Sequence, residues 1–566
     1  MKDRRKRDVV SWSRFFWCTL FFVVSCVLFT GFSFSTFHLL FQREKFRPEI
    51  VSGWRNPAMQ AISGDSPAVS IRDMVILPDQ VLIFLSYPPS TPLFTKEDLH
   101  CLYLSPNASQ SAFVQPPDYI NDQGVRDQIV RCPLNPRGFS ISLILESGAL
   151  LLHPGPTHKW DSLVYEATID RDNTTVAFVK GLNLRPDKVY EPSRFECVYG
   201  WDFRKPRFLL RASVITIAQE IVRCETPLSV LNALQNDGIK VSVRAKGSGT
   251  LRSVARLGIG FSLGPGPEVS RKRYDMCACT MVRNQARFLK EWVMYHAQIG
   301  VQRWFIYDNN SDDDIDTVID SLADANFNIS KRVWPWIKTQ ESGFAHCALT
   351  ARSSCNWVAF IDVDEFFHLR LGSSLHEVIS NHSRPKQIGE IRVACHNFGP
   401  SGLSRIPVEG VTVGYTCRLL APERHKSIVR PEALNSTLIN VVHHFHLREG
   451  FNCVNADRGM LVINHYKYQV WEVFKEKFYR RVATYVADWQ NEQNVGSKDR
   501  APGLGTKPVE PPDWSSRFCE VQDTGLRDRV VLNFKDPVTN IFPWQEGNKK
   551  LGEILVQEKW RVQNKM

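Results

Sequence analysis

Phe360-Ile361-Asp362-Val363-Asp364-Glu365-Phe366-Phe367 places three acids between apolar residues. The apolar run Trp357-Val358-Ala359-Phe360-Ile361 that leads into it is typical of a buried strand. Side chains alternate between the two faces of a strand, so Asp362 and Asp364 are predicted to point to the same side. Paired carboxylates suit Mg²⁺ or Mn²⁺, ions that commonly share their coordination with substrate phosphates. The stretch therefore predicts a metal-assisted nucleotide-sugar site at the carboxyl end of a strand in an α/β sheet.

Strand and helix patterns alternate on the N-terminal side of this stretch. Phe288, Trp292, Tyr295 and Ile299 recur every three or four residues, the spacing of one helix face. Strands are predicted over residues 276–281, 303–307, 330–334 and 357–361, and helices over residues 285–299, 315–325 and 343–353. This alternation predicts a Rossmann-like α/β domain with a mostly parallel sheet, which we place at residues 263–566.

Residues 71–262 show a different pattern. Short apolar runs such as Val81-Leu82-Ile83-Phe84-Leu85 alternate with Pro, Gly, Asn and Asp, which predicts a β-sandwich-like domain. Exposed aromatic residues there could bind carbohydrate, although large rings more often supply buried area. The candidate rings are Trp160, Tyr199 and Trp201, and the cysteines available for disulfides are Cys101, Cys132, Cys197 and Cys224. The turn-rich Gly264-Pro265-Gly266-Pro267 joins this domain to the next.

The N-terminus has the pattern of a membrane anchor. Residues 15–41 contain no Asp, Glu, Lys or Arg, and about 20 apolar residues suffice to cross a bilayer. Basic residues dominate the preceding residues 1–14, so the positive-inside rule predicts a cytosolic tail. We expect a single-pass type II protein with one transmembrane helix and a stem over residues 42–70. A cleaved signal peptide is the alternative.

Cysteine content and charge agree with a lumenal protein. Of the 14 cysteines only Cys18 and Cys26 lie in the expected anchor, and an oxidising lumen favours disulfides for the others. Cys277-Ala278-Cys279 lacks a second close Cys or His pair, so disulfides are favoured there over a metal site. A lumenal location argues against nucleic acid, and the net charge of +11 instead favours acidic polysaccharide or sugar-nucleotide phosphates. Glycosylation sequons occur at Asn107, Asn173, Asn309, Asn328, Asn381 and Asn435.

A nucleotide-sugar enzyme must hold its nucleotide and neutralise the departing diphosphate. Asp308, at the end of a predicted strand, could accept hydrogen bonds from ribose or uracil, and Arg283 and Asn284 could contact the nucleotide or its phosphates. A glycan on Asn309 would block this turn, so we expect Asn309 to be unmodified. The acidic run at residues 312–314 is expected to face water. Candidate cations for the diphosphate are Lys426, Arg430 and Lys467.

A neutral imidazole is a further ligand type for the metal. His465, in Ile463-Asn464-His465-Tyr466-Lys467, offers one beside Asp362 and Asp364, and a purely structural histidine is the alternative. Glu365 is expected to orient the metal site rather than to act as a base.

Five segments carry a resemblance to a known family. They are Cys279-Thr280-Met281-Val282-Arg283-Asn284, Tyr307-Asp308-Asn309-Asn310-Ser311, Phe360-Ile361-Asp362-Val363-Asp364-Glu365-Phe366, His425-Lys426-Ser427-Ile428-Val429-Arg430-Pro431 and Asn464-His465-Tyr466. They resemble glycosyltransferase family 92, and within it the plant enzymes that extend β-1,4-galactan on pectin. The resemblance covers the anchor, the β-rich region and the catalytic domain. It implies a GT-A fold, Mn²⁺ held with the help of His465, UDP-galactose as donor, an inverting mechanism in the Golgi, a carbohydrate-binding-module-like β domain and, by family habit, a homodimer.

An inverting mechanism requires a base within hydrogen-bond reach of the acceptor hydroxyl. In GT-A enzymes this acid usually lies between the Asp-x-Asp and the late histidine, often near a helix start. Glu432 follows Pro431, a residue favoured at the first helical position, and is therefore our first candidate. Glu423 is the second candidate, and Glu409 and Asp457 are rivals.

Residues 471–489 carry aromatic and apolar side chains at helical spacing, which predicts a core-facing stripe rather than an acceptor platform. The stripe consists of Trp471, Phe474, Phe478, Val482, Tyr485 and Trp489, and the basic residues Lys475, Lys477, Arg480 and Arg481 are expected to be solvated or to guide an acidic pectin backbone.

The sequence thus predicts a Golgi galactosyltransferase that lengthens pectic β-1,4-galactan. One alternative keeps the fold but uses another UDP-sugar, such as a pentopyranose donor. Another is a lectin-like scaffold with an inactive transferase domain. A glycoside hydrolase is disfavoured, because it needs two separated carboxylates and no nucleotide pocket.

Overall fold

The computed structural model describes residues 69–545, apart from gaps at 89–90, 106–112, 123–126, 148–154, 183, 186–187, 204–206, 208, 234–237, 248, 258–271, 372–373, 384–386, 442 and 486–508. The expected cytosolic tail and anchor, nearly all of the expected stem, and the joint at 264–267 lie outside these residues. Within the described residues, no helix combines the length and the apolar character needed to cross a membrane.

A nine-stranded sheet organises the C-terminal region, with the order β19-β18-β17-β20-β24-β22-β28-β21 and β27 paired to β22. Its first four strands are mutually parallel. They are β17 (Tyr274–Val282), β18 (Arg303–Asp308), β19 (Ile329–Val333) and β20 (Cys355–Phe360). They agree with the four strands predicted from the sequence, and their carboxyl ends lie at one edge of the sheet.

The other half of this sheet mixes directions. β24 (His425–Val429) runs antiparallel to both β20 and β22, and β21 (Glu365–Leu369) runs antiparallel to β28. β22 (Ile388–Asn397) is parallel to β28 (Leu461–His465) and to β27 (Asn452–Asn455). The α/β architecture predicted from the sequence is therefore confirmed, with antiparallel strands added on one side.

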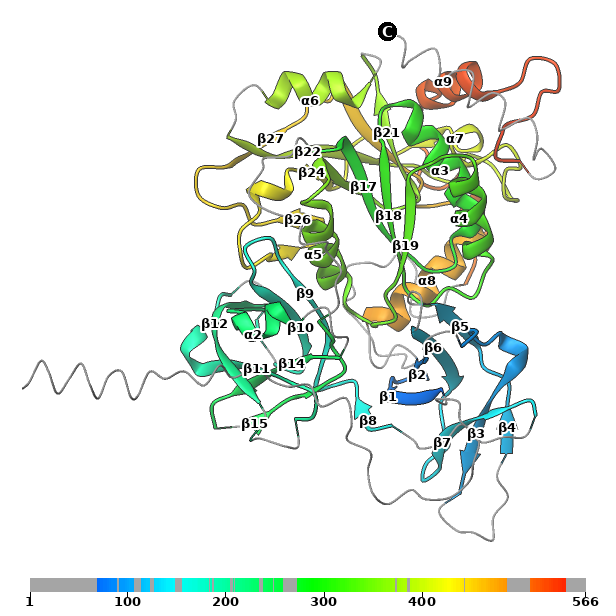
Figure 1. The fold of residues 1–566 in the computed structure, drawn as a ribbon. Coiled ribbons are helices and arrows are strands. Elements are labelled where there is room, and N and C mark those ends of the chain that lie inside the picture. Colours follow the sequence, from blue (N-terminus) through cyan, green and yellow to red (C-terminus); the bar gives the residue numbers. More distant parts are fainter. Residues whose placement is uncertain are drawn as a thin grey trace, which may run out of the picture. The chain divides into compact units, whose positions relative to one another are not determined.

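Helices cover both faces of the sheet because alternate residues of its strands face opposite ways. Ala278 of β17 packs with apolar residues of α3 and α4, whereas Cys277 and Cys279 pack with apolar residues of α5. Figure 1 shows these helices flanking the sheet. The long helices are α3 (Ala286–Gln298), α4 (Ile315–Asp324), α5 (Gln340–Ala351), α6 (Leu375–Ser383), α8 (Trp471–Tyr485) and α9 (Gly525–Phe534). The first three confirm the predicted helices.

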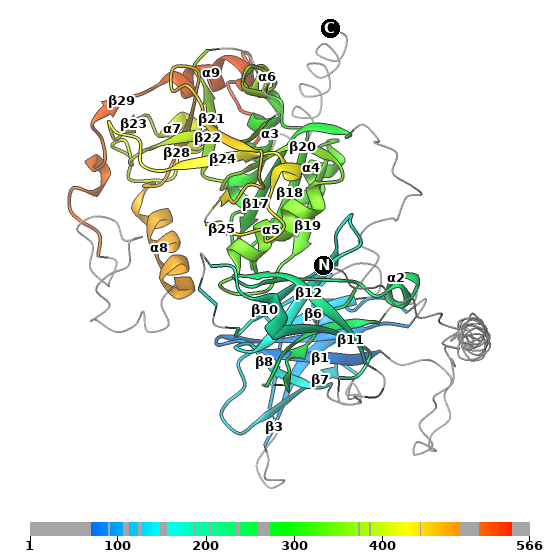
Figure 2. The ribbon, with the colours of Figure 1, turned by 90° about the vertical axis from the view of Figure 1, so that its left-hand side faces the viewer.

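The remaining elements of this region are short. They are α7 (Val411–Gly414), β23 (Cys417–Arg418), β25 (Asn440–Val441), β26 (His444–Phe445) and β29 (Val521–Gln522). Figure 1 and Figure 2 both show α6 and α9 at one end of the nine-stranded sheet and α8 at the other. The carboxyl ends of β17, β18 and β20 point to the end at which α8 lies.

The preceding region is made almost entirely of strands, as predicted, and it forms three sheets with the orders β5-β6-β2-β1-β8, β15-β14-β11-β12-β13-β10-β9-β16 and β4-β3-β7. The strands of the first and third sheets are β1 (Ser70–Ile76), β2 (Gln80–Ser86), β3 (Leu99–Leu104), β4 (Phe113–Gln115), β5 (Tyr119–Asp122), β6 (Asp127–Pro133), β7 (Ser140–Leu145) and β8 (Thr157–Lys159). Those of the second are β9 (Leu163–Ile169), β10 (Thr175–Lys180), β11 (Phe195–Gly200), β12 (Leu210–Ala218), β13 (Ile221–Cys224), β14 (Lys240–Ala245), β15 (Gly249–Thr250) and β16 (Arg252–Ser253), with the short helix α2 (Leu228–Asn232).

The aromatic candidates of this region separate clearly. Trp160 is 7% exposed and Tyr199 is fully buried, so these two rings belong to the core. Trp201, just after β11, is 56% exposed and remains available to a ligand.

The predicted disulfides are present. The described residues contain Cys101–Cys132, Cys197–Cys224, Cys277–Cys355, Cys279–Cys347 and Cys417–Cys519. Cys277 and Cys279 thus link β17 to the start of β20 and to α5, which excludes the metal site considered for that pair. Cys395 and Cys453 are free thiols.

Candidate functional site

Asp362 and Asp364 lie in a turn, not in a strand. β20 ends at Phe360, and the N–H of Glu365 donates to the carbonyl of Asp362 at 3.1 Å. The Glu365 carboxylate returns this bond by accepting from the N–H of Asp362 at 3.1 Å. Strand alternation therefore does not orient the two carboxylates, contrary to our prediction. The turn presents them at the carboxyl end of β20, where each meets a different set of partners.

Asp362 faces β24 and the segment that follows it. The Lys426 ammonium donates to Asp362 Oδ2 at 2.9 Å and lies 2.5 Å from His443 Nε2, which is 3.6 Å from the same oxygen. Burial by itself raises the pKa of Asp362, but Lys426 and His443 outweigh it and hold that pKa well below its usual range. Asp362 is therefore an anion at any physiological pH.

Asp364 faces β28 and α8. His465 Nε2 lies 3.5 Å from Asp364 Oδ2, and the Lys477 ammonium donates to the same oxygen. Burial would raise the pKa of Asp364, but Lys477 and His465 together lower it. The register that pairs His465 with Glu365 on β21 holds the imidazole beside the turn.

His465 is in the form in which an imidazole binds metals. Burial lowers its pKa to about 4, so the ring is neutral at physiological pH. Its Nε2 is buried and makes no hydrogen bond with any described residue, although it is aimed at Asp364. Its Nδ1 lies 3.6 Å from Glu365 Oε1. An unpartnered Nε2 that faces Asp364, on a ring that lies between two carboxylates, fits a metal ligand better than a purely structural histidine.

Glu365 is completely buried beneath this cluster. Lys426 lies 3.1 Å from its Oε1, and burial, opposed by Lys426, raises its pKa to about 8. Its contacts to the Asp362 backbone, Lys426 and His465 suit the orienting role expected from the sequence. A base that must reach solvent and an acceptor would not be enclosed in this way.

The oxygen and nitrogen donors of Asp362, Asp364 and His465 fit a divalent cation in type. In the described ranges, however, no three His, Cys, Asp or Glu side chains are gathered as a metal ion requires. Two lysines lie on the carboxylates instead, Lys426 on Asp362 and Lys477 on Asp364.

The residues expected to bind the donor nucleotide lie at the carboxyl ends of β17 and β18. Asp308 is 1% exposed, and its Oδ1 accepts from the N–H of Ser311 at 3.0 Å, whereas its Oδ2 is buried without a hydrogen-bond partner among the described residues. Burial raises its pKa. Asn284 holds the same turn, because its Oδ1 accepts from the N–H of Asp312 and its N–H donates to Ser311 Oγ. Arg283 is half-buried at the end of β17.

Asn309 uses its side chain within this turn. Its amide nitrogen donates to the carbonyls of Trp334 at 2.7 Å and of Trp336 at 3.0 Å. A glycan on that nitrogen would break both bonds, which agrees with the expectation that Asn309 is unmodified.

Glu423 is linked to His465 of the carboxylate cluster through Asn397. Asn397 pairs with His465 across β22 and β28, and its amide nitrogen donates to Glu423 Oε2, to which Lys467 also donates at 3.0 Å. The Glu423 side chain is 51% exposed. Burial raises its pKa, but the hydrogen bonds from Lys467 and Asn397 outweigh burial and lower it below the usual value. Glu423 is therefore an accessible carboxylate that is ionised at neutral pH.

Glu432 is placed elsewhere. β24 runs antiparallel to β20, so that Ser427 pairs with Phe360 and Val429 with Val358. The chain has therefore travelled toward the start of β20 when it reaches η4 (Pro431–Ala433). There Glu432 pairs with Arg171 at 3.0 Å and with Lys272 at 3.2 Å. Lys272 in turn donates to the carbonyl of Cys355, the first residue of β20.

This location does not fit our first candidate for the base. Glu432 and Asp362 are at opposite ends of β20, a strand about 20 Å long at about 3.3 Å per residue. Arg430 lies at the same far end, with its guanidinium 4.7 Å from the Trp357 ring centroid. Of the two rival candidates, Glu409 forms an ion pair with Lys535, and Asp457 accepts a hydrogen bond from the N–H of Gly459 within a turn.

Two members of the cluster were not singled out by the sequence. His443 is 1% exposed and contacts both Lys426 and Asp362. Its neighbour is also a histidine, which was the available signal, but nothing in the spacing brings it to the Asp-x-Asp. Lys477 was expected to be solvated, and it reaches Asp364 from α8.

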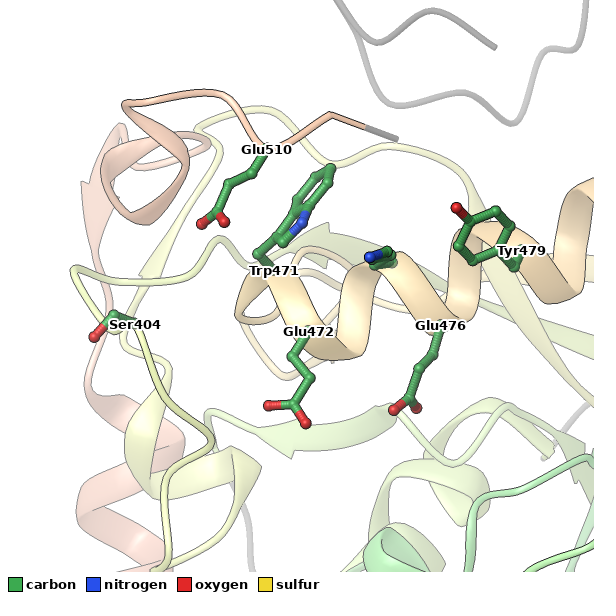
Figure 3. A pocket seen from close by; sticks show the side chains of 7 residues that line it. Ser404, Trp471, Glu472, Glu476, Tyr479 and Glu510 are labelled. Atoms are coloured by element: carbon green, nitrogen blue, oxygen red, sulfur yellow. The ribbon is translucent and has the colours of Figure 1, made fainter. Parts of the chain in front are cut away.

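α8 carries a core stripe on one side and a groove on the other. Phe474 and Phe478 are buried, as the spacing predicted, and residue 489 lies outside the described residues. A cavity of about 500 Å³ is lined by Ser404, Trp471, Glu472, Lys475, Glu476, Tyr479 and Glu510. Figure 3 shows Glu472 and Glu476 projecting together from one side of the helix. The helix that contacts Asp364 through Lys477 thus also forms an open, mixed aromatic and acidic groove.

Comparison with solved structures finds distant likenesses. A mannosyltransferase from Pyrobaculum calidifontis, in complex with GDP-Man and Mn²⁺, is 10% identical with a TM-score of 0.26 and covers 53% of this chain and 83% of that one. A fragment of S. aureus TarS is 10% identical with a TM-score of 0.22 and covers 37% of this chain and 65% of that one. At such TM-scores the likeness establishes neither a shared fold nor a shared ligand.

Sequence comparison is far stronger. The family model of glycosyltransferase family 92 matches residues 272–497. A family 92 protein of Ricinus communis is 67% identical over 96% of this chain and its own full length. Similar proteins of the same family occur in Oryza sativa (50% identical, 88% of this chain and 89% of that one) and Arabidopsis thaliana (46%, 85% and 86%). Identity at this level along nearly the whole chain, together with the carboxylate cluster, shows that the chain is a glycosyltransferase that belongs to family 92.

Proposed function

We propose that this protein transfers galactose from UDP-galactose to the growing β-1,4-galactan side chains of pectin, with inversion at the anomeric carbon. The observation that carries the proposal is the cluster of Asp362, Asp364 and neutral His465 at the carboxyl ends of a mostly parallel sheet. Ligands of open α/β sheets bind at that edge. The sequence resemblance to galactan synthases supplies the sugar and the acceptor.

Asp362, Asp364 and His465 would hold Mn²⁺, in a catalytic domain of GT-A type. When bound, such a cation neutralises charge on the departing diphosphate. Lys426 and Lys477 already place two ammonium groups on the carboxylates, so positive charge is available at this edge of the sheet. Glu365 and His443 position Asp362 and Lys426 from beneath.

The nucleotide would bind beside Asp308. The buried, unpartnered Oδ2 of Asp308 is an acceptor that a ribose hydroxyl or the uracil N–H can satisfy. Arg283 follows the neighbouring strand and can contact the phosphates, while Asn284 secures the turn. Lys467 pairs with Glu423 and therefore orients that carboxylate rather than standing free for the diphosphate.

Glu423 is the residue that we assign as the base. In the proposed step it removes the proton from the O4 hydroxyl of the terminal galactose, and that oxygen forms a bond to C1 of the donor galactose. The bond between C1 and the diphosphate oxygen breaks, and UDP departs from the opposite face. A carboxylate that is half exposed, ionised and linked to His465 through Asn397 satisfies these needs, which Glu432 does not.

The acceptor would approach along α8. Trp471 and Tyr479 supply aromatic surface, and Glu472, Glu476 and Glu510 supply hydrogen-bond acceptors for hydroxyl groups. Glu476 is ion-paired with Arg287, which leaves Glu472 and Glu510 against Lys475 and favours a neutral glycan over an acidic one. This supports the galactan side chain, rather than the acidic pectin backbone, as the segment held there.

The remaining parts of the proposal concern the cell. We propose a single-pass type II protein of the Golgi membrane, anchored by residues 15–41, with a lumenal catalytic region and a homodimeric assembly. The disulfides of the described region support an oxidising compartment. Trp201 would give the β-rich region a glycan-binding surface.

Incubation of the protein with a panel of UDP-sugars and galacto-oligosaccharides, with and without Mn²⁺, tests the proposal. We expect a lengthened product with UDP-galactose and Mn²⁺ only. Asp362→Ala should reduce this extension by at least about 100-fold, because it removes a proposed metal ligand and the partner of Lys426. A lengthened product with a pentopyranose donor would show that the enzyme transfers a sugar other than galactose. Binding of galactan without transfer would favour the inactive, lectin-like scaffold. Unchanged extension by Asp362→Ala would contradict the proposed metal site.

A further inference from the structure

A buried arginine of the β-rich region reaches the turn that follows β18. Arg131 on β6 is 2% exposed, and its guanidinium donates to the carbonyl of Ser311 at 2.7 Å and to that of Asn310 at 3.3 Å. The same group lies 3.0 Å from Asp312 Oδ1. One side chain thus binds three successive residues of this turn, which we call the 309–312 turn.

The arginine is itself held in place by its neighbour in the sheet. Tyr119 on β5 pairs directly with Arg131 in the strand register, and its ring lies 4.9 Å from the guanidinium carbon. The hydroxyl of Tyr119 donates to Asp316 Oδ2 at 2.9 Å, on the first turn of α4. Stacking on an aromatic face restricts the planar guanidinium to one orientation.

The 309–312 turn needs such support because it is strained and polar. Asn310 has a φ of +63°, a region that side-chain-bearing residues rarely adopt. Asn310 and Ser311 are nevertheless completely or almost completely buried, so their carbonyls require donors from the protein. Arg131 supplies donors to both. Without it these carbonyls would be buried without partners, and the turn would relax.

The conformation of this turn decides where Asp308 points. The N–H of Ser311 donates to Asp308 Oδ1 and thereby leaves Oδ2 as the unpartnered atom. We propose that Arg131 is a positioning residue for the nucleotide: from the β-rich region it fixes the 309–312 turn, so that Asp308 presents a free acceptor to the donor substrate. The inference rests on the proposed function, in which this edge of the sheet binds UDP.

A purely structural role is the competing explanation, because Arg131 also ties the β-rich region to the catalytic one. The chain offers a matched control. Arg223 on β13 is 3% exposed, and its guanidinium also crosses between the two regions, where it donates to the carbonyl of Ser436 at 3.0 Å. It pairs with Asp170 and, among the described residues, makes no hydrogen bond or ion pair with the 309–312 turn. Loss of either arginine therefore removes a comparable buried link, but of the two only Arg131 reaches the 309–312 turn.

The test compares the full-length wild type, Arg131→Met and Arg223→Met by UDP titration calorimetry in Mn²⁺, by thermal midpoint and by steady-state kinetics. Both variants should lower the thermal midpoint. Arg131→Met should weaken UDP binding about tenfold and raise KM for UDP-galactose to match, with kcat almost unchanged, because a binding interaction common to ground and transition states is lost. Arg223→Met should bind UDP as the wild type does.

Wild-type UDP affinity in Arg131→Met, or equal weakening in both variants, would overturn the inference. A wild type that binds no UDP would overturn the proposed function instead, and the inference with it. If Arg131→Met does not fold, Arg131→Lys keeps a cation in the site but cannot reach both carbonyls. Weakened UDP binding by that variant supports the positioning role, and unchanged binding contradicts it.

Discussion

Two glutamates show how the role of a residue depends on where the fold puts it. Glu423 and Glu432 are nine positions apart in the sequence, and both are partly exposed and paired with lysine. Glu423 shares its partners with His465, whereas Glu432 sits at the far end of β20. The antiparallel direction of β24 separates them, and no local pattern encodes that direction.

Glu423→Gln should reduce kcat by about 100-fold to 10,000-fold, which is the usual contribution of a general base. The change removes the proton acceptor but keeps the shape and the hydrogen bond from Lys467, so KM for UDP-galactose should change little. Steady-state rates with a galacto-oligosaccharide acceptor provide the measurement.

Glu432→Gln is the matched control for this prediction. Its ion pairs with Arg171 and Lys272 are partly exposed, and such pairs contribute little to stability. The kcat of the Glu432→Gln variant should therefore remain within about twofold of the wild-type value. Equal losses in the two variants, or a loss in Glu432→Gln alone, would contradict the assignment of Glu423.

At the scale of elements, the contact between α3 and α7 depends on one buried carboxyl. Glu291 on α3 accepts from the N–H groups of Val411 and Thr412 at 2.8 and 2.9 Å and from the Thr412 hydroxyl at 2.6 Å. Burial nevertheless dominates these bonds and raises the pKa of Glu291 to about 7. Gly410 has no side chain where a Cβ would lie 2.7 Å from this carboxyl.

The raised pKa of Glu291 predicts a pH dependence of stability. A carboxyl with a higher pKa in the folded than in the unfolded state binds more protons when folded, so its contribution is complete below the unfolded pKa and is lost as pH rises through about 7. Between pH 5 and pH 8 the wild type should lose roughly 3 kcal/mol of unfolding free energy through this group.

Denaturant unfolding of the wild type and of Glu291→Gln at both pH values measures this loss. Glutamine does not titrate, so the difference in unfolding free energy between the two proteins should shift in favour of Glu291→Gln as the pH rises. Parallel pH profiles for the two proteins would show that Glu291 does not titrate in this range.

At the scale of the whole molecule, the β-rich region both contacts the catalytic region and exposes an aromatic ring. Arg131 and Arg223 link the two through buried guanidinium groups, and Arg352 of the catalytic region pairs with Asp170 at 2.7 Å. Of these contacts, that of Arg131 reaches the 309–312 turn. The ring of Trp201, in contrast, is exposed and is not part of the hydrophobic core.

Trp201→Ala should weaken binding of long β-1,4-galactan by about tenfold, since stacking of a sugar on an exposed indole would be lost. Transfer to a short acceptor should be unchanged, because the ring is not part of the carboxylate cluster. Affinity electrophoresis in galactan gels and a rate assay with a galacto-oligosaccharide separate the two effects.

Leu228→Ala supplies the control for that experiment. Leu228 is 76% exposed in the same region but has no aromatic face. The Leu228→Ala variant should bind long β-1,4-galactan as the wild type does. Normal mobility of Trp201→Ala in galactan gels would exclude Trp201 as a glycan-binding surface.

The periodic parts of the chain were predictable. β17 to β20 and α3 to α5 agree with the predicted elements. Apolar residues recur with a period of two in strands and of about 3.6 in helices, and this recurrence can be read from the sequence. The disulfide partners of the cysteines were not predictable, since pairing depends on which strands become neighbours. The strand conformation expected for Asp362 and Asp364 was also mispredicted, because β20 ends before them and a turn follows.

By itself, the sequence determined the α/β alternation, the β-rich region before it and the acids and histidine that identify a family 92 glycosyltransferase, because each is carried by a local pattern or motif. Only the tertiary structure decided that His443 and Lys477 join the cluster, that Glu423 rather than Glu432 is linked to it through Asn397, and that Arg131 reaches the 309–312 turn. These contacts join residues far apart in the chain. Strand direction and register set them, and neither can be read from the spacing of residues along the sequence.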